Sequence, residues 1–253
     1  MSADWGRQTV HTSRDDYGPI LVINEGAQRI LNFDSQFEQS CMQVSHPCQL
    51  VYKYTRFMAL ATAFVDPAHI SLFGLGGGSL LRTLHSVLPE CTFEVVELRQ
   101  AVIDVADEFF LLPGDHRVRI TAGDAFDYVR RMDSASSDII FSDMFDAHCV
   151  APGQLHGDFL RQCARVLGPR GFLVINLHAL PKDRRAFFAM LGEIFPAIAL
   201  SETVENTILY ASRVDPARVE INYQRIEDLE TQLRQRLMHL LARVKPVEPG
   251  GRG

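Results

Sequence analysis

The feature that most constrains this chain is a run of glycines placed directly after a short apolar segment. Residues 70–73 are typical of a buried strand, and leucines and a valine recur at helical spacing between residues 80 and 88. The glycines between them are Gly74, Gly76, Gly77 and Gly78. Strand, glycine turn and helix form the first half of a nucleotide-binding βαβ unit, because glycine lets the backbone approach a ligand and the helix start adds N–H groups beside it.

A second predicted strand supports this interpretation. It covers residues 92–97 and ends in Glu97, about twenty residues after the glycines, where such folds place an acid on ribose hydroxyls. The alternative is a tight turn followed by an incidental surface glutamate.

Strands and helices alternate along the rest of the chain, which is the pattern of a mostly parallel sheet covered by helices. We expect strands at 69–73, 92–97, 117–122, 137–142, 171–176, 197–201 and 206–212, and helices near 79–88, 100–110, 125–132, 157–167 and 182–194. The last two strands are too close to enclose a crossover helix, so they should form an antiparallel hairpin at one edge. The predicted fold class is α/β, with a Rossmann-like, mostly parallel seven-stranded sheet.

The segments outside this sheet complete the predicted organisation. We expect a flexible arm over residues 1–16, a small antiparallel β unit over 17–48, the main nucleoside-binding domain over 49–214, a C-terminal helix over 215–245 and a disordered tail over 246–253. The last helix carries an apolar stripe, which either packs on its own domain or forms a dimer contact.

Composition excludes several classes of protein. A net charge of −6 gives no electrostatic support for nucleic-acid binding. The 5 cysteines include no Cys-x-x-Cys pair, which argues against a disulfide framework or a zinc site and favours the cytoplasm. No apolar run approaches the roughly 20 residues of a membrane helix, so we expect no membrane association.

Acidic side chains follow two further predicted strands. Asp124 follows the third strand, and Asp143 and Asp146 follow the fourth. Ligands collect at the carboxyl ends of parallel strands, so these acids should face one cleft. Asp124 is either a ligand residue or only a helix N-cap. Asp143 and Asp146 are either a base and a cation-binding acid or two solvated loop residues, and no His or Cys joins them as a metal ligand.

With these motifs in place, the chain resembles the spermidine synthase (aminopropyltransferase) family, which is related to S-adenosylmethionine-dependent methyltransferases of class I. The similarity covers about residues 20–213. The family's Gly-Gly-Gly-Asp-Gly motif corresponds to Gly74-Leu75-Gly76-Gly77-Gly78, and its Val-Glu-Ile-Asp motif corresponds to Val96-Glu97-Leu98-Arg99. The Gly-Asp-Ala motif is Gly123-Asp124-Ala125 here, and the Asp-x-x-Asp motif is Asp143-Met144-Phe145-Asp146.

The resemblance implies roles for these residues. Glu97 would hold the ribose, Asp124 beside Ala125 would bind adenine, and Gln39 would join the glycines around the nucleoside. Asp143 would be the base toward the attacking amine, and Asp146 would help to bind that amine. The co-substrate would be decarboxylated S-adenosylmethionine or S-adenosylmethionine, with no metal and no tightly bound cofactor. The acceptor would be a small-molecule amine, and the protein a homodimer.

Three departures from the family concern the amine half of the site. The family's Asp within the glycine run is Gly77 here, Arg99 replaces an acid, and Tyr-His-Glu becomes Tyr52-Lys53-Tyr54. Aminopropyl transfer to an amine, as in polyamine biosynthesis, is the leading hypothesis. The alternatives are a small-molecule methyltransferase, which the loss of the acid at Gly77 would suit, and a non-catalytic nucleoside-binding protein. A dinucleotide dehydrogenase is a more distant possibility.

Overall fold

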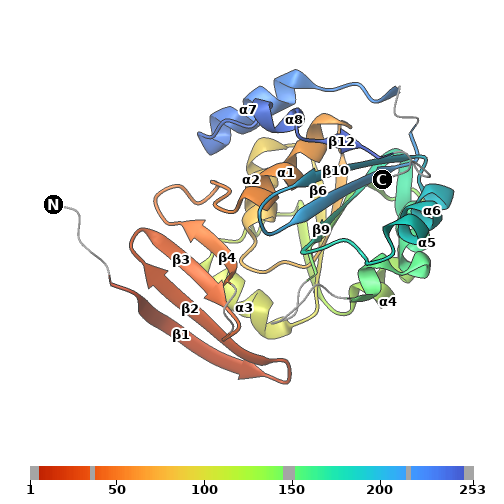
Figure 1. Cartoon of the computed structure of the whole chain (residues 1–253). Coiled ribbons are helices and arrows are strands. Elements are labelled where there is room, and N and C mark those ends of the chain that lie inside the picture. The colour runs from red at the N-terminus through yellow and green to blue at the C-terminus, as the bar shows by residue number, and fades with distance from the viewer. Residues whose placement is uncertain (1–5, 35–37, 145–151, 215–217, 248–253) are drawn as a thin grey trace.

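The computed structural model describes residues 6–34, 38–144, 152–214 and 218–247. Figure 1 shows a small sheet, β1 to β4, beside a larger domain in which helices cover both faces of a second sheet. No helix among the described residues is long and apolar enough to cross a membrane.

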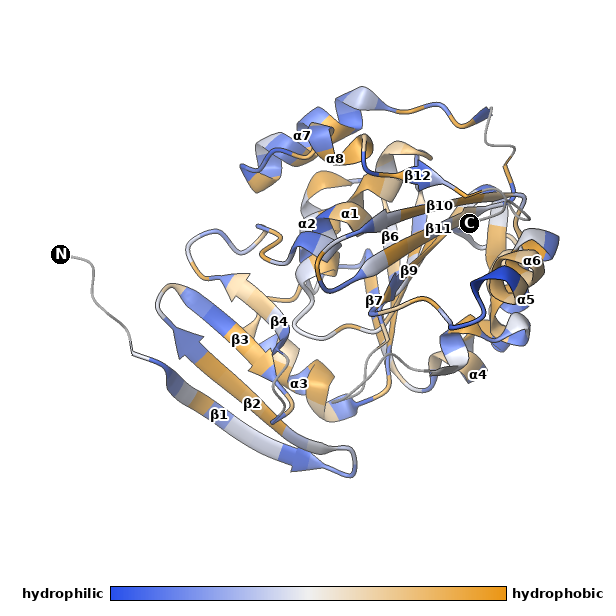
Figure 2. Cartoon of the chain, in the orientation of Figure 1, coloured by the Kyte–Doolittle hydropathy of each residue, from blue (hydrophilic) through white to orange (hydrophobic). Residues whose placement is uncertain are grey.

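The small sheet is an antiparallel meander that begins earlier than expected. Its strands are β1 (Gln8–Asp15), β2 (Gly18–Glu25), β3 (Gln28–Asn32) and β4 (Glu38–Gln43). Residues 8–15 are therefore not a flexible arm. β1 is a largely polar edge strand, whereas β2 is largely apolar (Figure 2), so β1 lacks the apolar alternation by which strands are detected. Its backbone pairing with β2 holds it in place.

The larger sheet has the order β12-β10-β11-β9-β8-β5-β6-β7. Its strands are β5 (His69–Phe73), β6 (Thr92–Glu97), β7 (Val118–Ala122), β8 (Ser137–Ser142), β9 (Leu167–Leu177), β10 (Ala197–Glu202), β11 (Thr207–Ser212) and β12 (Lys245–Pro246). Strands β5 to β9 run parallel, while β10 and β11 form the expected antiparallel hairpin. The Rossmann-like α/β fold is confirmed.

Two apolar layers hold the helices on this sheet. One layer joins α2 (Ser79–Val87) and the segment α1 (Lys53–Ala59) with η1 (Leu60–Ala63) to one face. The other layer joins α4 (Ala125–Arg131), α5 (Gly157–Val166) and α6 (Arg184–Ile194) to the opposite face. Helix α3 (Gln100–Phe109) packs against β2 and β3 through Val102, Val105, Ile20 and Leu31, which fixes the small sheet beside the main domain.

The C-terminal segment differs from the predicted single helix. It forms α7 (Tyr223–Leu233) and α8 (Met238–Leu241), because Arg234 takes the left-handed conformation at φ 53° and ends α7. The apolar stripe is buried in the core of its own domain, as the first alternative held. Lys245 and Pro246 pair with β10 as an eighth strand. The sheet therefore has one strand more than the seven predicted, and Pro246 is not part of a disordered tail. Residues 215–217 and 248–253 lie outside the described residues.

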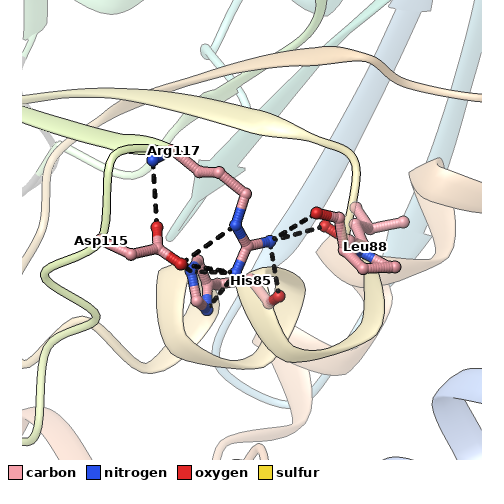
Figure 3. A network of polar contacts seen from close by, with 5 residues as sticks. His85, Leu88, Asp115 and Arg117 are labelled. Carbon is pink, nitrogen blue, oxygen red and sulfur yellow. Dashed lines mark hydrogen bonds and ion pairs between the residues drawn. The ribbon is translucent and has the colours of Figure 1, made fainter.

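The helix that follows the glycines is anchored at its far end by Arg117, as Figure 3 shows. The Arg117 guanidinium donates to the carbonyl oxygens of Leu88 and Pro89, both at 3.1 Å, and to the Asp115 carboxylate at 2.9 Å. It also contacts the His85 ring. A cation that binds the last carbonyls of a helix offsets both their missing partners and the helix dipole. Helix α2 is thereby held with its N-terminus at the glycine turn.

Candidate active site

A cavity of about 390 Å³ lies where the carboxyl ends of β5, β6 and β8 meet the small sheet. Its wall includes seven of the residues predicted for the site, namely Gln39, Gly74, Gly76, Glu97, Asp124, Ala125 and Asp143. Gly77 and Gly78 are not part of the wall. Asp146 lies outside the described residues, so its role stays a prediction. Side chains that are far apart in the sequence thus share one cavity.

The glycine turn at the cavity requires glycine most strictly at Gly74. Its φ of +95° is one that side chains rarely adopt, and a Cβ there would lie 2.2 Å from the carbonyl oxygen of Asp143. The Gly74 N–H donates to the carbonyl of Val96 at 2.8 Å. The turn therefore passes directly between the ends of β6 and β8.

Glu97 is held by the backbone at the end of β6. Its side chain accepts hydrogen bonds from the N–H of Leu75 at 2.9 Å and of Arg99 at 3.1 Å, one on each carboxylate oxygen. Burial raises the pKa of Glu97, and the backbone N–H groups oppose that rise. A carboxylate fixed in this way keeps lone pairs that can accept from two neighbouring hydroxyls, as a ribose presents.

Asp143 follows β8 and is bound by two different elements. The Tyr54 hydroxyl of α1 donates to Oδ2 at 3.2 Å, and the Asn176 amide of β9 donates to Oδ1 at 2.8 Å. Burial raises the pKa of Asp143 to about 6, although both hydrogen bonds favour the charged form. A carboxylate with a pKa closer to neutral is a better proton acceptor than an ordinary aspartate and remains mostly charged at pH 7.

Asp124 is a helix N-cap, as one of the two alternatives held, and its ligand role stays a prediction. It is the N-cap of α4, because its Oδ1 accepts from the N–H of Phe126 at 2.7 Å. The same exposed residue lines the cavity next to Ala125. Capping therefore orients the carboxylate at the cavity edge and leaves it within reach of a ligand.

Arg99, one of the departures from the family, binds the small sheet. Its guanidinium forms two hydrogen bonds with the Asp15 carboxylate, at 3.0 and 2.8 Å, and a third with the Gly18 carbonyl at 2.9 Å. It also lies 4.4 Å above the Phe33 ring. Burial alone would raise the pKa of Asp15, but hydrogen bonds from Arg99 and from the backbone lower it. Sequence reasoning missed this pair because its partners are 84 residues apart.

The Tyr52-Lys53-Tyr54 departure places a tyrosine at the cavity. Lys53 is exposed and is not among the residues that line the cavity, whereas Tyr54 lines it and contacts Asp143. The Tyr52 hydroxyl donates to Glu38 at 2.7 Å, and the Tyr52 ring stacks on Tyr54 with 6.0 Å between ring centroids. The lysine is therefore exposed outside the cavity wall, and the tyrosine beside it lines the cavity.

Gly77 is tightly covered by a serine of the small sheet. A Cβ at Gly77 would lie 2.8 Å from the Ser40 hydroxyl and 3.0 Å from the Phe110 ring. The Ser40 hydroxyl is 3.2 Å from that of Ser79, and both serines line the cavity. This part of the wall carries neutral hydroxyl groups, and an acid at position 77 would require Ser40 to move.

Comparison with known proteins places this geometry in a family. The sequence matches the O-methyltransferase domain family over residues 32–202. It is 32% identical over 232 residues to a polyamine aminopropyltransferase of Chromobacterium violaceum, and the alignment covers 88% of each chain. The chain belongs to the polyamine aminopropyltransferase family.

Solved structures share the fold of the chain. A probable spermidine synthase from Corynebacterium glutamicum superposes with a TM-score of 0.74 at 23% identity, over 88% of this chain and 86% of that one. Human methyltransferase-like protein 13, solved in complex with SAH, superposes with a TM-score of 0.57 at 23% identity, over 72% of this chain and 90% of that one. The same fold therefore supports both aminopropyltransferases and methyltransferases.

Proposed function

We propose that the chain transfers an aminopropyl group from decarboxylated S-adenosylmethionine to a small-molecule amine. The observation that carries the proposal is that Asp143, with its pKa raised to about 6, shares one cavity with the backbone-held Glu97 and the glycine turn. The donor is a co-substrate, which leaves as methylthioadenosine, and the chain is a transferase of the type that makes polyamines.

The nucleoside half of the site would bind through fixed groups. Glu97 would accept from the two ribose hydroxyls, and Asp124 would accept from the adenine amino group at the edge of the cavity. Gly74 and Gly76 would let the backbone lie against the nucleoside, with Gln39 facing it from the small sheet. Glu97 and Asp124 are held by backbone N–H groups before the ligand arrives, so less ordering of these carboxylates opposes binding.

The amine half of the site would prepare the nucleophile. A primary amine with a pKa of about 10 is mostly protonated at pH 7 and cannot attack until it loses a proton. Asp143 would accept that proton, and the nitrogen lone pair freed in this way would form a bond to the aminopropyl carbon. The carbon–sulfur bond breaks, its electron pair stays on sulfur, and the sulfonium becomes a neutral thioether. Positioning in line supplies most of the remaining rate enhancement.

Donor preference tests this proposal directly. We would measure binding of S-adenosylmethionine, its decarboxylated form and methylthioadenosine by calorimetry, and turnover of each donor with aliphatic diamines. Preference for the decarboxylated donor, with release of methylthioadenosine, is expected. Asp143→Asn should retain methylthioadenosine binding and lose turnover. Nucleoside binding without turnover of either donor would instead indicate a non-catalytic binding protein.

One observation favours a methyltransferase as the second candidate. The Ser40 hydroxyl occupies the space beside Gly77 where the family has an acid, so this wall offers no negative charge to an ammonium group. Such a wall also admits the carboxylate of complete S-adenosylmethionine. Turnover of that donor to S-adenosylhomocysteine, with none of the decarboxylated donor, would establish methyl transfer.

Two further predictions concern the setting of the enzyme. We propose a homodimer in the cytoplasm, on the strength of the family resemblance and the cysteine composition. The apolar stripe of α7 is buried within its own chain, so a dimer must use another surface. Sedimentation equilibrium of the full chain would test the dimer, and fractionation of the source cells would test the location.

A further inference from the structure

The two oxygens of Asp143 have different surroundings. Oδ1 accepts from the Asn176 amide at 2.8 Å, and Oδ2 accepts from the Tyr54 hydroxyl at 3.2 Å. Asn176 is only 1% exposed and comes from β9, on the sheet side of the carboxylate, whereas Tyr54 lines the cavity. Oδ1 therefore contacts a buried side chain, and Oδ2 contacts a side chain that lines the cavity.

Asn176 is fixed in one orientation by the charge beside it. A rotated amide would place its oxygen against the carboxylate oxygen, where two acceptors repel. In the observed orientation the Asn176 Oδ1 is buried without a hydrogen-bond partner among the described residues. Burying an acceptor without a partner costs free energy, and the hydrogen bond from the Asn176 amide to the charged Asp143 offsets that cost.

A buried polar network supports Asn176 from behind. The Gln154 amide donates to the Asn176 main-chain carbonyl at 3.2 Å, and the Ser142 hydroxyl donates to Gln154 at 2.7 Å. Ser142 and Gln154 are both completely buried. The network connects the end of β8, the η2 turn (Pro152–Leu155) and β9, and it leaves the Asn176 side-chain amide free to act on Asp143.

Tyr54 differs from Asn176 because its hydroxyl can act in both directions. Burial, and next the negative charge of Asp143, raise the pKa of Tyr54 well above its ordinary value, so the phenol stays protonated. A phenol can donate to a charged carboxylate and can accept from a protonated one. An amide N–H can only donate, and it has no acceptor role toward a protonated oxygen.

We propose that the hydrogen bond from Asn176 keeps Oδ1 of Asp143 unprotonated, so that the proton from the attacking amine binds to Oδ2. The Tyr54 hydroxyl, which donates to Oδ2 before the transfer, then accepts a hydrogen bond from it. The inference rests on the proposed function. The nitrogen–hydrogen bond breaks and its proton moves to Oδ2. The nitrogen lone pair then forms the new bond to the aminopropyl carbon as the carbon–sulfur bond breaks, and its electron pair leaves with the sulfur of methylthioadenosine. Asn176 is a positioning residue, and Tyr54 is its counterpart on the cavity side.

The other charged groups near the Asp143 carboxylate do not determine which of its oxygens takes the proton. Among the described residues, the ionisable side chain in contact with Asp143 is Tyr54 from α1, and the contact from β9 is the neutral Asn176. Glu97, Arg99 and Asp124 line the same cavity. None of the three is among the groups that shift the pKa of Asp143.

The first test measures the ionisation of Asp143 without any substrate. Infrared difference spectra between the full-length protein and Asp143→Asn, recorded across pH, give the pKa of Asp143 and the stretching frequency of its C=O group. Removing a hydrogen bond to a charged group in Asn176→Leu should raise that pKa by about one to two units. Tyr54→Phe should raise it as well, by a smaller amount, because its hydrogen bond is longer.

The C=O frequency distinguishes the two oxygens. If the proton resides on Oδ2, the remaining C=O is Oδ1, and loss of its donor in Asn176→Leu should move the stretch to higher frequency. Tyr54→Phe should then move it little. The reverse pattern, or an unchanged pKa in both variants, overturns the inference. If Asn176→Leu does not fold, Tyr54→Phe still decides, because Tyr54 lines the cavity and the truncation leaves its ring in place.

A matched control and a kinetic measurement complete the test. Gln154→Leu removes the neighbouring buried amide but not the contact with Asp143, so it should leave the pKa of Asp143 unchanged while lowering stability. Turnover of Asn176→Leu would also be measured against pH with the donor that the enzyme prefers. The acid limb of this profile should move to higher pH, whereas a purely structural loss would lower the rate without moving the limb. Absence of aminopropyl transfer in the unaltered protein would refute the proposed function and leave the infrared result to decide the oxygen assignment.

Discussion

The conformation of Gly74 leads to the sharpest prediction about the site. In Gly74→Ala the new Cβ would lie 2.2 Å from the Asp143 carbonyl oxygen, at a φ of +95°. That oxygen must move by about 1 Å to reach an ordinary contact. Backbone strain of about 1–3 kcal/mol and overpacking of about 1–3 kcal/mol together predict a loss of about 4 kcal/mol in the free energy of unfolding.

Alanine substitutions at two other glycines separate the cost of backbone strain from the cost of steric conflict. Gly76 has a φ of +53°, but the nearest atom to a Cβ there is 3.8 Å away, so Gly76→Ala should cost only the conformational strain of about 1–2 kcal/mol. Gly114 has neither a positive φ nor an atom within 4 Å. Gly114→Ala should therefore be neutral or stabilising by up to about 1 kcal/mol.

Urea unfolding followed by circular dichroism would rank the three variants, and turnover would be measured on the same samples. Because Gly74→Ala displaces the backbone that carries Asp143, it should also reduce turnover by about 100-fold, the usual effect of a 1 Å misplacement. A Gly74→Ala protein as stable as Gly76→Ala, with normal turnover, would refute the argument that the turn and Asp143 share their space.

Further predictions concern charged groups around the cavity. Asp15→Asn should cost about 2 kcal/mol in the free energy of unfolding, since it removes the charge and one of the two oxygens that accept from the buried Arg99. The difference from the parent protein should vanish as acid protonates Asp15 below its ordinary pKa of 3.8, and its persistence there would contradict the pairing. Arg117→Met should cost about 1–2 kcal/mol by removing the cap of α2, with nucleoside affinity unchanged. Glu97→Gln should weaken all adenosyl nucleosides alike in calorimetry, and unaltered affinity would exclude its ribose role. Turnover should fall as pH drops through about 6, where Asp143 becomes protonated; a flat profile from pH 5 to 7 would argue against Asp143 as the base.

Local patterns were sufficient for the main sheet apart from β12, and for the acids at its edge. The predicted strands are rich in apolar residues, and the glycines after β5 and Glu97 after β6 sit where a nucleoside-binding sheet needs them. Parallel strands bring their carboxyl ends to one edge, so the cavity shared by Glu97 and Asp143 followed from spacing alone.

Elements without a local pattern were not predicted. Strand β1 is polar because it lies at an edge, and its order depends on pairing with β2. The break at Arg234 divides the last helix although its apolar spacing continues. Beyond the break, the side-chain carboxylate of Glu230 accepts from the N–H of Met238 at 2.8 Å. Sequence periodicity reports which residues become buried, and it does not report where the backbone turns.

The sequence by itself determined the fold class, the glycine turn and the chemical identity of the acids at the sheet edge, because those depend on spacing within one unit of structure. Only the tertiary structure decided which groups surround these acids. It placed Tyr54 and Asn176 on opposite oxygens of Asp143, Ser40 against Gly77, and Arg99 on Asp15. These contacts join residues from different elements, and their physical basis is the close packing that brings those elements together.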